Sequence, residues 1–137
     1  MKLIYPVIFT QAEDVVLVEV PDMEILTEGK DIPDAIDMAR DAIGIKSISL
    51  KEGGIALPVS TSIENVDMSK AEFAGEGQSF ISIVDVDYDE YKRRQDNKMV
   101  RRNVTLPNWL NLEAEKEGIN VSGLLQEALA QRLGVQR

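Results

Sequence analysis

Three hydrogen-bonding side chains alternate along one stretch of the chain, and their types suit the reading of DNA bases. Arg101, Asn103 and Thr105 stand at every second position, so in a strand they would share one face. Arginine pairs well with the edge of guanine, asparagine with adenine, and threonine with a base or a phosphate. The alternation therefore predicts a strand whose outer face contacts nucleic acid.

The neighbouring residues predict two helices behind this strand. Residues 99–106 are expected to form the strand, and its other face carries Val100, Val104 and Leu106. Pro107 suits the start of a helix because its missing N–H costs nothing there, and Gly118 suits the end. Asn120 is a good cap for a second helix. The apolar stripe of that helix consists of Val121, Leu124, Leu125, Ala128, Leu129 and Leu133.

The start of the second helix supplies another part of the predicted site. Its first N–H groups have no partner within the helix, so with Asn120 and Ser122 they would hold a backbone phosphate. A lone strand cannot satisfy its own backbone, and so short a unit cannot bury enough apolar surface. Two copies that pair their strands remove both problems and form a ribbon that fits the major groove. The alternative is an ordinary strand-helix-helix dimerisation arm with an exposed polar face.

This arrangement resembles the ribbon-helix-helix family of DNA-binding domains. The resemblance rests on Arg101-x-Asn103-x-Thr105-Leu106-Pro107 and on two helices that meet at Gly118-x-Asn120-x-Ser122. It implies a homodimer in which Arg101, Asn103 and Thr105 contact the bases. Arg102 departs from the pattern, because the family usually has an apolar residue at that inward position.

The composition of the chain excludes several kinds of functional site. The 137 residues include no cysteine and no histidine, which excludes disulfides, ordinary zinc or haem sites and the commonest general base. We therefore expect no metal and no cofactor. No apolar run is long enough for a membrane span, and the first residues look like a strand rather than a signal peptide, so we expect a cytoplasmic protein.

The charge is divided unevenly along the chain. Residues 1–91 carry 6 basic and 19 acidic side chains, a net charge of −13, whereas residues 92–137 carry 9 and 5, a net charge of +4. An acidic part followed by a basic part indicates two units with two different partners.

The N-terminal part predicts a small sheet with one helix. Strands are indicated at residues 3–9, 16–20, 24–28 and 80–86, and an amphipathic helix at residues 31–51. Pro6 places the first strand at an edge of the sheet, or turns its missing N–H outward. The apolar density of the last strand predicts a central position for it.

The whole chain is similar to HicB antitoxins. The similarity rests on the hairpin, Val20-Pro21-Asp22, Thr27-Glu28-Gly29 and a helix beginning near Asp31 with Pro33-Asp34-Ala35, combined with the C-terminal pattern. It implies an α+β chain with a degenerate RNase-H-like ββ(β)αβ domain at 1–90, a linker at 91–98 and a ribbon-helix-helix domain at 99–137. It also implies two partners: a small, basic, mRNA-cleaving toxin of the HicA type, and the operator DNA of the antitoxin's own operon. Assembly beyond a homodimer stays open.

Two other functions stay open on the residues alone. One is a ribbon-helix-helix repressor whose acidic domain binds a small ligand or another protein. The other is a metal-dependent nuclease of the RNase H type, which needs clustered carboxylates. The first strand carries none, so we expect no catalytic residue and no enzyme. Asp85, Asp87 and Asp89 would share one face of a strand end, as a weak Mg²⁺ site or, in our preferred interpretation, a charged strand exit.

Overall fold

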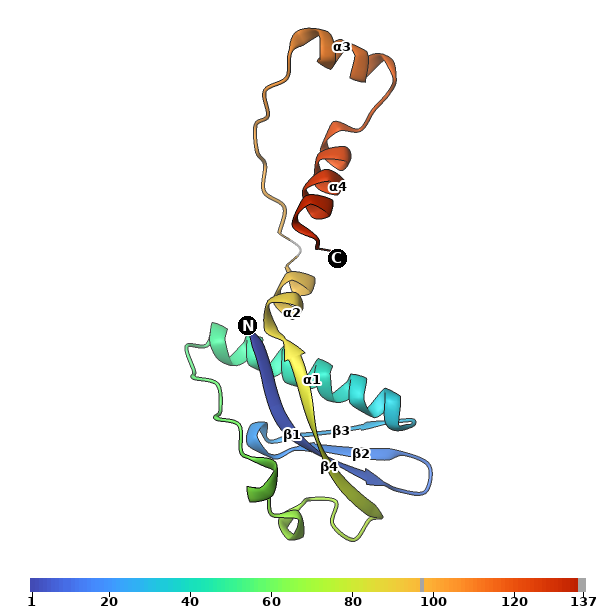
Figure 1. Cartoon of the computed structure of the whole chain (residues 1–137), viewed down its shortest axis with the longest axis vertical. Coiled ribbons are helices and arrows are strands. Elements are labelled where there is room, and N and C mark those ends of the chain that lie inside the picture. The colour runs from blue at the N-terminus through green and yellow to red at the C-terminus, as the bar shows by residue number, and fades with distance from the viewer. Residues whose placement is uncertain (97, 136–137) are drawn as a thin grey trace. The chain divides into compact units, whose positions relative to one another are not determined.

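The computed structural model describes residues 1–96 and 98–135, and the chain divides into two compact units, Met1–Gln95 and Asp96–Arg137 (Figure 1). This boundary assigns the basic residues 92–94 to the first unit. Residues 1–95 then carry 9 basic and 19 acidic side chains, a net charge of −10, and residues 96–137 carry 6 and 5, a net charge of +1. The first unit is therefore strongly acidic, and the second is close to neutral.

The first unit is built on a four-stranded antiparallel sheet. Its strands are β1 (Lys2–Gln11), β2 (Val16–Val20), β3 (Ile25–Gly29) and β4 (Gln78–Asp87). Their order across the sheet is β3-β2-β1-β4. β4 pairs with the whole of β1, from Lys2 opposite Asp87 to Gln11 opposite Gln78, so the chain returns after a long excursion to lie beside its first strand (Figure 1).

This strand order corrects two expectations. The apolar strand at 80–86 is β4 and lies at an edge of the sheet, so the prediction of a central position is wrong. β1 is an internal strand, so of the two alternatives for Pro6 the sheet edge is wrong, whereas the outward-turned N–H agrees with the register. The first residue of β1 with a partner in β2 is Ile8, and Pro6 lies before it, where a missing N–H interrupts no pairing with β2.

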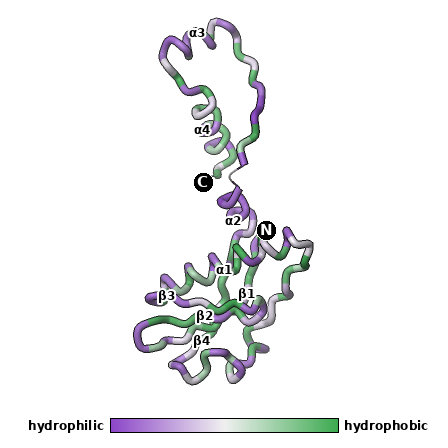
Figure 2. Tube along the Cα trace, turned by 180° about the vertical axis from the view of Figure 1, so that it is seen from behind, coloured by the Kyte–Doolittle hydropathy of each residue, from purple (hydrophilic) through white to green (hydrophobic). Residues whose placement is uncertain are grey.

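One face of the sheet is covered by α1 (Ile32–Glu52), and the hydrophobic core lies between them. The core consists of Tyr5, Val7, Phe9, Val16, Val18, Val20, Met23, Ile25, Ala35, Ala39, Ile43, Val84 and Val86. Figure 2 shows the strands as largely hydrophobic stretches of the chain. Asp31 caps the helix by accepting a hydrogen bond from the Asp34 N–H at 2.9 Å, and Pro33 stands in the first turn. The predicted helix and its apolar stripe are confirmed.

The opposite face is covered in part by the segment that joins α1 to β4. This segment contains the short helices η2 (Ile63–Asn65) and η3 (Met68–Lys70), and a third, η1 (Pro21–Met23), joins β2 to β3. The Thr61 hydroxyl donates to the Asp22 carboxylate at 2.6 Å, and the Glu72 N–H donates to the Glu19 carboxylate at 3.0 Å. These contacts hold the segment against the sheet, where Ile8 is buried.

A short helix, α2 (Tyr88–Gln95), follows β4 directly and completes the first unit. Its sequence is strongly hydrophilic, as Figure 2 shows, yet Tyr91 lies against the backbone of α1 at Gly44. Residues 91–95, expected in a linker, are therefore helical and belong to the packed unit.

The second unit contains α3 (Asn108–Lys116) and α4 (Val121–Leu133). Pro107 precedes α3, Gly118 follows it with a left-handed φ of 67°, and Asn120 caps α4, as the sequence predicts. Residues 99–106 are expected as a strand, but no strand is assigned to them in the single chain. A strand is defined by pairing, and no described residue of this unit pairs with that stretch.

None of the helices in the described part of the chain combines the length and the apolar character needed to cross a membrane.

Candidate functional site

The residues predicted to read DNA bases lie at the surface of the second unit. Arg101, Asn103 and Thr105 are all exposed, and the stretch that carries them runs extended before α3 (Figure 1). An extended backbone places alternate side chains on one side. The three side chains are exposed, and their alignment on one side of a paired strand stays a prediction.

The other two predicted residues lie together in the first turn of α4. The Asn120 side-chain oxygen accepts a hydrogen bond from the Gly123 N–H at 3.1 Å, so this side chain holds the start of the helix. Ser122 is exposed beside it. Asn120 therefore has a capping role in the structure, and the phosphate contact of Asn120 and Ser122 stays a prediction.

The second unit exposes its apolar side chains to water. No residue among 96 and 98–135 is buried, and the exposed fractions reach 80% for Val100, 67% for Trp109 and 71% for Leu133. The predicted stripe of α4 is exposed as well, including Leu124 and Leu129. A folded unit with so much apolar surface and no core requires a second surface to cover it.

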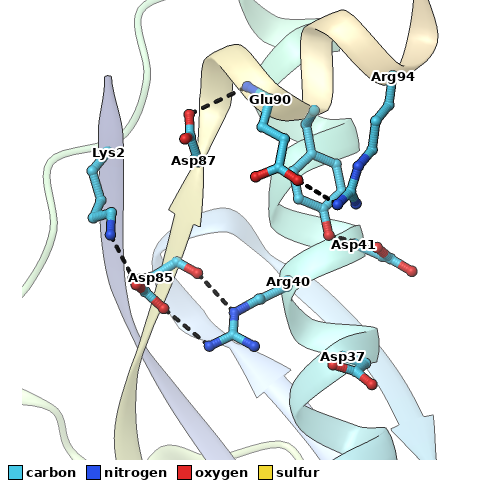
Figure 3. Close-up of a pocket in the computed structure, with 9 residues that line it drawn as sticks. Lys2, Asp37, Arg40, Asp41, Asp85, Asp87, Glu90 and Arg94 are labelled. Carbon is cyan, nitrogen blue, oxygen red and sulfur yellow. Dashed lines mark hydrogen bonds and ion pairs between the residues drawn. The ribbon is translucent and has the colours of Figure 1, made fainter. Parts of the chain in front are cut away.

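In the first unit, a cluster of charged side chains lines a cavity of about 560 Å³ at the ends of β1 and β4 and beside α1 and α2 (Figure 3). Arg40 donates to the Asp85 carboxylate and to the Asp85 backbone carbonyl, both at 3.1 Å, and Lys2 lies 3.3 Å from the same carboxylate. The hydrogen bonds from Arg40 and then Lys2 hold the pKa of Asp85 below its ordinary value. An ionised Asp85 thus joins β4 to α1 and β1.

The other two aspartates of the predicted group have partners of their own. The Asp87 carboxylate accepts a hydrogen bond from the Glu90 N–H at 3.2 Å, at the start of α2. Asp89 lies in α2 rather than on the strand and pairs with the ammonium group of Met1, which lowers the pKa of Asp89. Asp85 and Asp87 therefore lie two positions apart on β4 and line the same cavity, as expected, whereas the expectation that Asp89 shares their face is wrong. Among the residues that the structure describes, no cluster of carboxylates could hold a metal ion.

Two residues of this region were not predicted from the sequence. Arg40 lies on α1 and binds Asp85, which is 45 positions away in the sequence. Tyr91 was expected in a linker but donates its hydroxyl to Asp41 at 2.6 Å. Burial, together with this hydrogen bond, raises the pKa of Tyr91 to about 12. The sequence offered one signal for the Tyr91 contact, namely Gly44. A glycine inside a helix often has a packing reason, such as a side chain of another segment lying against the helix backbone.

The chain has clear relatives among known protein families and structures. Residues 5–128 match the family described as HicB_like antitoxin of bacterial toxin-antitoxin system. No curated protein matches the chain. A chain of the toxin-antitoxin complex from Streptococcus pneumoniae is similar at 26% identity with a TM-score of 0.61, over 96% of this chain and 99% of the other.

Two further structures are similar. The antitoxin HicB of Burkholderia pseudomallei is 26% identical with a TM-score of 0.51, over 96% of this chain and 97% of the other. A chain of the HicA3 and HicB3 toxin-antitoxin complex is 20% identical with a TM-score of 0.51, over 62% of this chain and 99% of the other, which shows a shared fold. The four-stranded antiparallel sheet and four helices described above therefore form the mixed α+β fold of these proteins. By its sequence match, the chain belongs to the family of HicB-like antitoxins of bacterial toxin–antitoxin systems.

Proposed function

We propose that the chain neutralises a small, basic, RNA-cleaving toxin of the HicA type through residues 1–95 and represses its own promoter through a ribbon-helix-helix dimer of residues 96–137. The observation that carries this proposal is the division of the chain into an acidic unit with a complete core and a second unit without one. The first can fold and bind as a single copy, whereas the second needs another copy of itself.

The dimer follows from the exposed surface of the second unit. If two copies pair residues 99–106 antiparallel, their backbones satisfy each other and one face of the ribbon turns inward. Val104 and Leu106 lie on that face with Arg102 at its beginning, and the apolar stripes of α3 and α4 from both copies would cover the apolar part. The outer face then presents Arg101, Asn103 and Thr105 twice, related by a two-fold axis, to the major groove.

The toxin contact follows from charge and from the relatives. Residues 1–95 carry a net charge of −10, which attracts a cationic RNA-binding protein and raises the rate of encounter. Two of the similar structures are toxin-antitoxin complexes, which supports a toxin as the partner of this chain also. An acidic antitoxin that covers a basic RNA-binding surface would block the access of RNA by mimicking its charge.

The arrangement of the carboxylates in the first unit favours a non-enzymatic role. Nucleases of the RNase H type hold metal ions with clustered carboxylates, but β1 contains no Asp or Glu. Asp85, Asp87 and Asp89 are each bound to a different partner, namely Arg40 with Lys2, the Glu90 N–H and the N-terminus. These acids stabilise the fold, and we propose no catalytic residue in the chain.

Toxin binding is tested by co-expressing the chain with the product of the adjacent gene. We expect the two proteins to co-purify, growth to be rescued, and a chain truncated after Gln95 to rescue growth as well. The association rate should fall as salt rises, while the dissociation rate changes less. If only the C-terminal unit captured the toxin, the proposed division of labour would be wrong.

Promoter binding is tested separately with a mobility shift on the DNA upstream of the operon. The full chain should bind this DNA in preference to unrelated DNA of the same length, and the chain truncated after Gln95 should not bind it. Equal binding of both DNAs at every salt concentration would contradict a base-reading role.

A further inference from the structure

The outer edge of β4 lacks the features that usually protect an edge strand. β4 lies at the end of the sheet, so every second residue points its N–H and C=O away from β1. Natural edge strands are shortened, bulged or marked with lysine or proline, which prevents pairing with other chains. Residues 78–84 read Gln-Ser-Phe-Ile-Ser-Ile-Val and contain no charge, proline or glycine. This edge is therefore suited to pair with another strand.

The side chains along this edge are apolar and partly in water. Phe80 is 44% and Ile83 54% exposed, and Ile4 of the adjacent strand is 48% exposed. Ile81 and Ile83 lie opposite Ile8 and Pro6 in the register, on the face away from α1, whereas Phe80 stacks on Phe9 on the other face. Within the described residues, no backbone hydrogen bond from outside the sheet reaches 78–84.

We propose that β4 pairs with β4 of a second copy, antiparallel about a two-fold axis at Ser82, so that the two sheets form one continuous sheet. This register places Ile81 of each copy opposite Ile83 of the other, and Phe80 opposite Val84. Four isoleucines then meet on one face of the joined sheets. Cross-strand pairs of β-branched and aromatic side chains are the ones that stabilise antiparallel sheets.

Two-fold axes one residue away from Ser82 give less favourable pairs of opposed side chains. An axis at Ile83 would place Ile81 opposite the charged Asp85. An axis at Ile81 would place Phe80 opposite Ser82 and leave Ile83 opposite Ser79. Only the axis at Ser82 matches apolar residues with apolar residues on both faces of the strand.

The hydrogen-bonded pairing between the two β4 strands would end at a defined residue. Arg40 donates to the Asp85 backbone carbonyl and to its carboxylate, so that carbonyl already has a partner. Pairing about Ser82 therefore extends from Phe80 to Val84 in each copy. The acidic end of β4, with Asp85 and Asp87, stays outside the paired region.

The charge distribution favours a second copy over a basic protein at this edge. A cationic partner gains from contact with carboxylates, and residues 78–84 contain none. A second copy gains from apolar contact alone and works against the net charge of −10 on each unit. This contact should therefore strengthen as salt rises, because salt screens the repulsion, in contrast to the contact with a basic toxin.

The test uses the full chain and a single introduced cysteine, since the natural sequence has none. Directly opposed residues in antiparallel strands have Cα atoms about 4.5–5.5 Å apart, within the range that a disulfide bridges. Mild oxidation should therefore convert Ser82→Cys into a covalent dimer, and the yield should persist or rise at high salt. The matched control is Ser49→Cys, an exposed serine on α1, which should remain largely unlinked.

A second variant separates strand pairing from random collision. Ile83→Lys adds the charge that protects natural edges, at an exposed position, and should abolish linking of Ser82→Cys while the circular dichroism spectrum stays unchanged. Equal linking of Ser82→Cys and Ser49→Cys, or linking that survives Ile83→Lys, would overturn the proposal. Absence of linking in Ser82→Cys, together with loss of toxin binding in Ile83→Lys, would also overturn the proposal. It would show that the toxin, rather than a second copy, binds the outer edge of β4.

Discussion

The aromatic ring of Tyr91 lies against Gly44 so closely that a single added carbon would collide with it. A Cβ atom at Gly44 would stand 2.7 Å from two ring carbons of Tyr91. The hydroxyl of the same tyrosine donates to Asp41 at 2.6 Å, three residues before the glycine in α1. These two contacts fix α2 against α1 and explain why a charged sequence that resembles a linker is part of a folded unit.

Gly44→Ala should destabilise the protein by about 1–3 kcal/mol, the usual cost of forcing extra volume into a packed contact. The same change in an open helix would stabilise it by about 1 kcal/mol, so the sign of the effect is informative. Chemical denaturation measures both values. In a Tyr91→Ala background the clash is absent, and Gly44→Ala should stabilise. A stabilising effect of Gly44→Ala alone would show that the ring does not press on the helix.

Tyr91 should make stability fall in strongly alkaline solution. Its pKa is raised from 10.0 to about 12 in the folded protein, so between these values the unfolded chain loses the proton while the folded chain keeps it. Proton loss then favours unfolding, and the contribution of Tyr91 is complete below pH 10 and disappears as the pH rises to about 12. Urea unfolding across this range should show a steeper decline for the natural chain than for Tyr91→Phe. Parallel declines would contradict the raised pKa.

The double variant Arg101→Ala with Asn103→Ala should lose specific promoter binding without loss of fold. Each base contact is worth about 1–3 kcal/mol and is counted twice in a symmetric dimer. Both side chains are exposed, so the thermal unfolding temperature should hardly change, and toxin neutralisation should persist. The matched control is Arg132→Ala, an exposed arginine on α4. Undiminished promoter binding by the double variant would show that this face is not the reader.

Leu106→Asp should dissociate the proposed C-terminal dimer. In a peptide of residues 96–137 we expect sedimentation as a dimer for the natural sequence and as a monomer for the variant, because a charge would enter the paired apolar face unpartnered. Helical circular dichroism should fall with it, since the unit has no core of its own. The peptide with Lys116→Asp, which changes an exposed side chain, serves as the control. A dimeric Leu106→Asp peptide would place the interface elsewhere.

Local spacing was enough to predict the elements that depend on local interactions. The helix over 31–51 follows from an apolar stripe and from the cap at Asp31, and α4 follows from Asn120 in the same way. Caps and helical periodicity act over three or four residues, so they are visible in any short window of sequence. The strands were found for the same reason, since alternation is also local.

The position of each strand in the sheet was decided only by the tertiary structure. β4 has the apolar density of a central strand, yet it lies at the edge, because β2 already occupies the other side of β1 and no described strand follows β4 in the sheet. The contact of Arg40 with Asp85 joins residues 45 positions apart, and the contact of Tyr91 with Asp41 joins residues 50 apart.

The sequence by itself determined the family resemblance, the helices α1, α3 and α4 and the strands of the sheet, and it predicts the outward triplet Arg101, Asn103 and Thr105. Only the tertiary structure decided that α2 belongs to the acidic unit, that Asp89 lies on a helix apart from Asp85 and Asp87, and that β4 lies at an edge of the sheet. The physical reason is that these features arise from packing between segments far apart in the chain. Such packing depends on the shape that the whole unit adopts, and no local pattern of residue types encodes it.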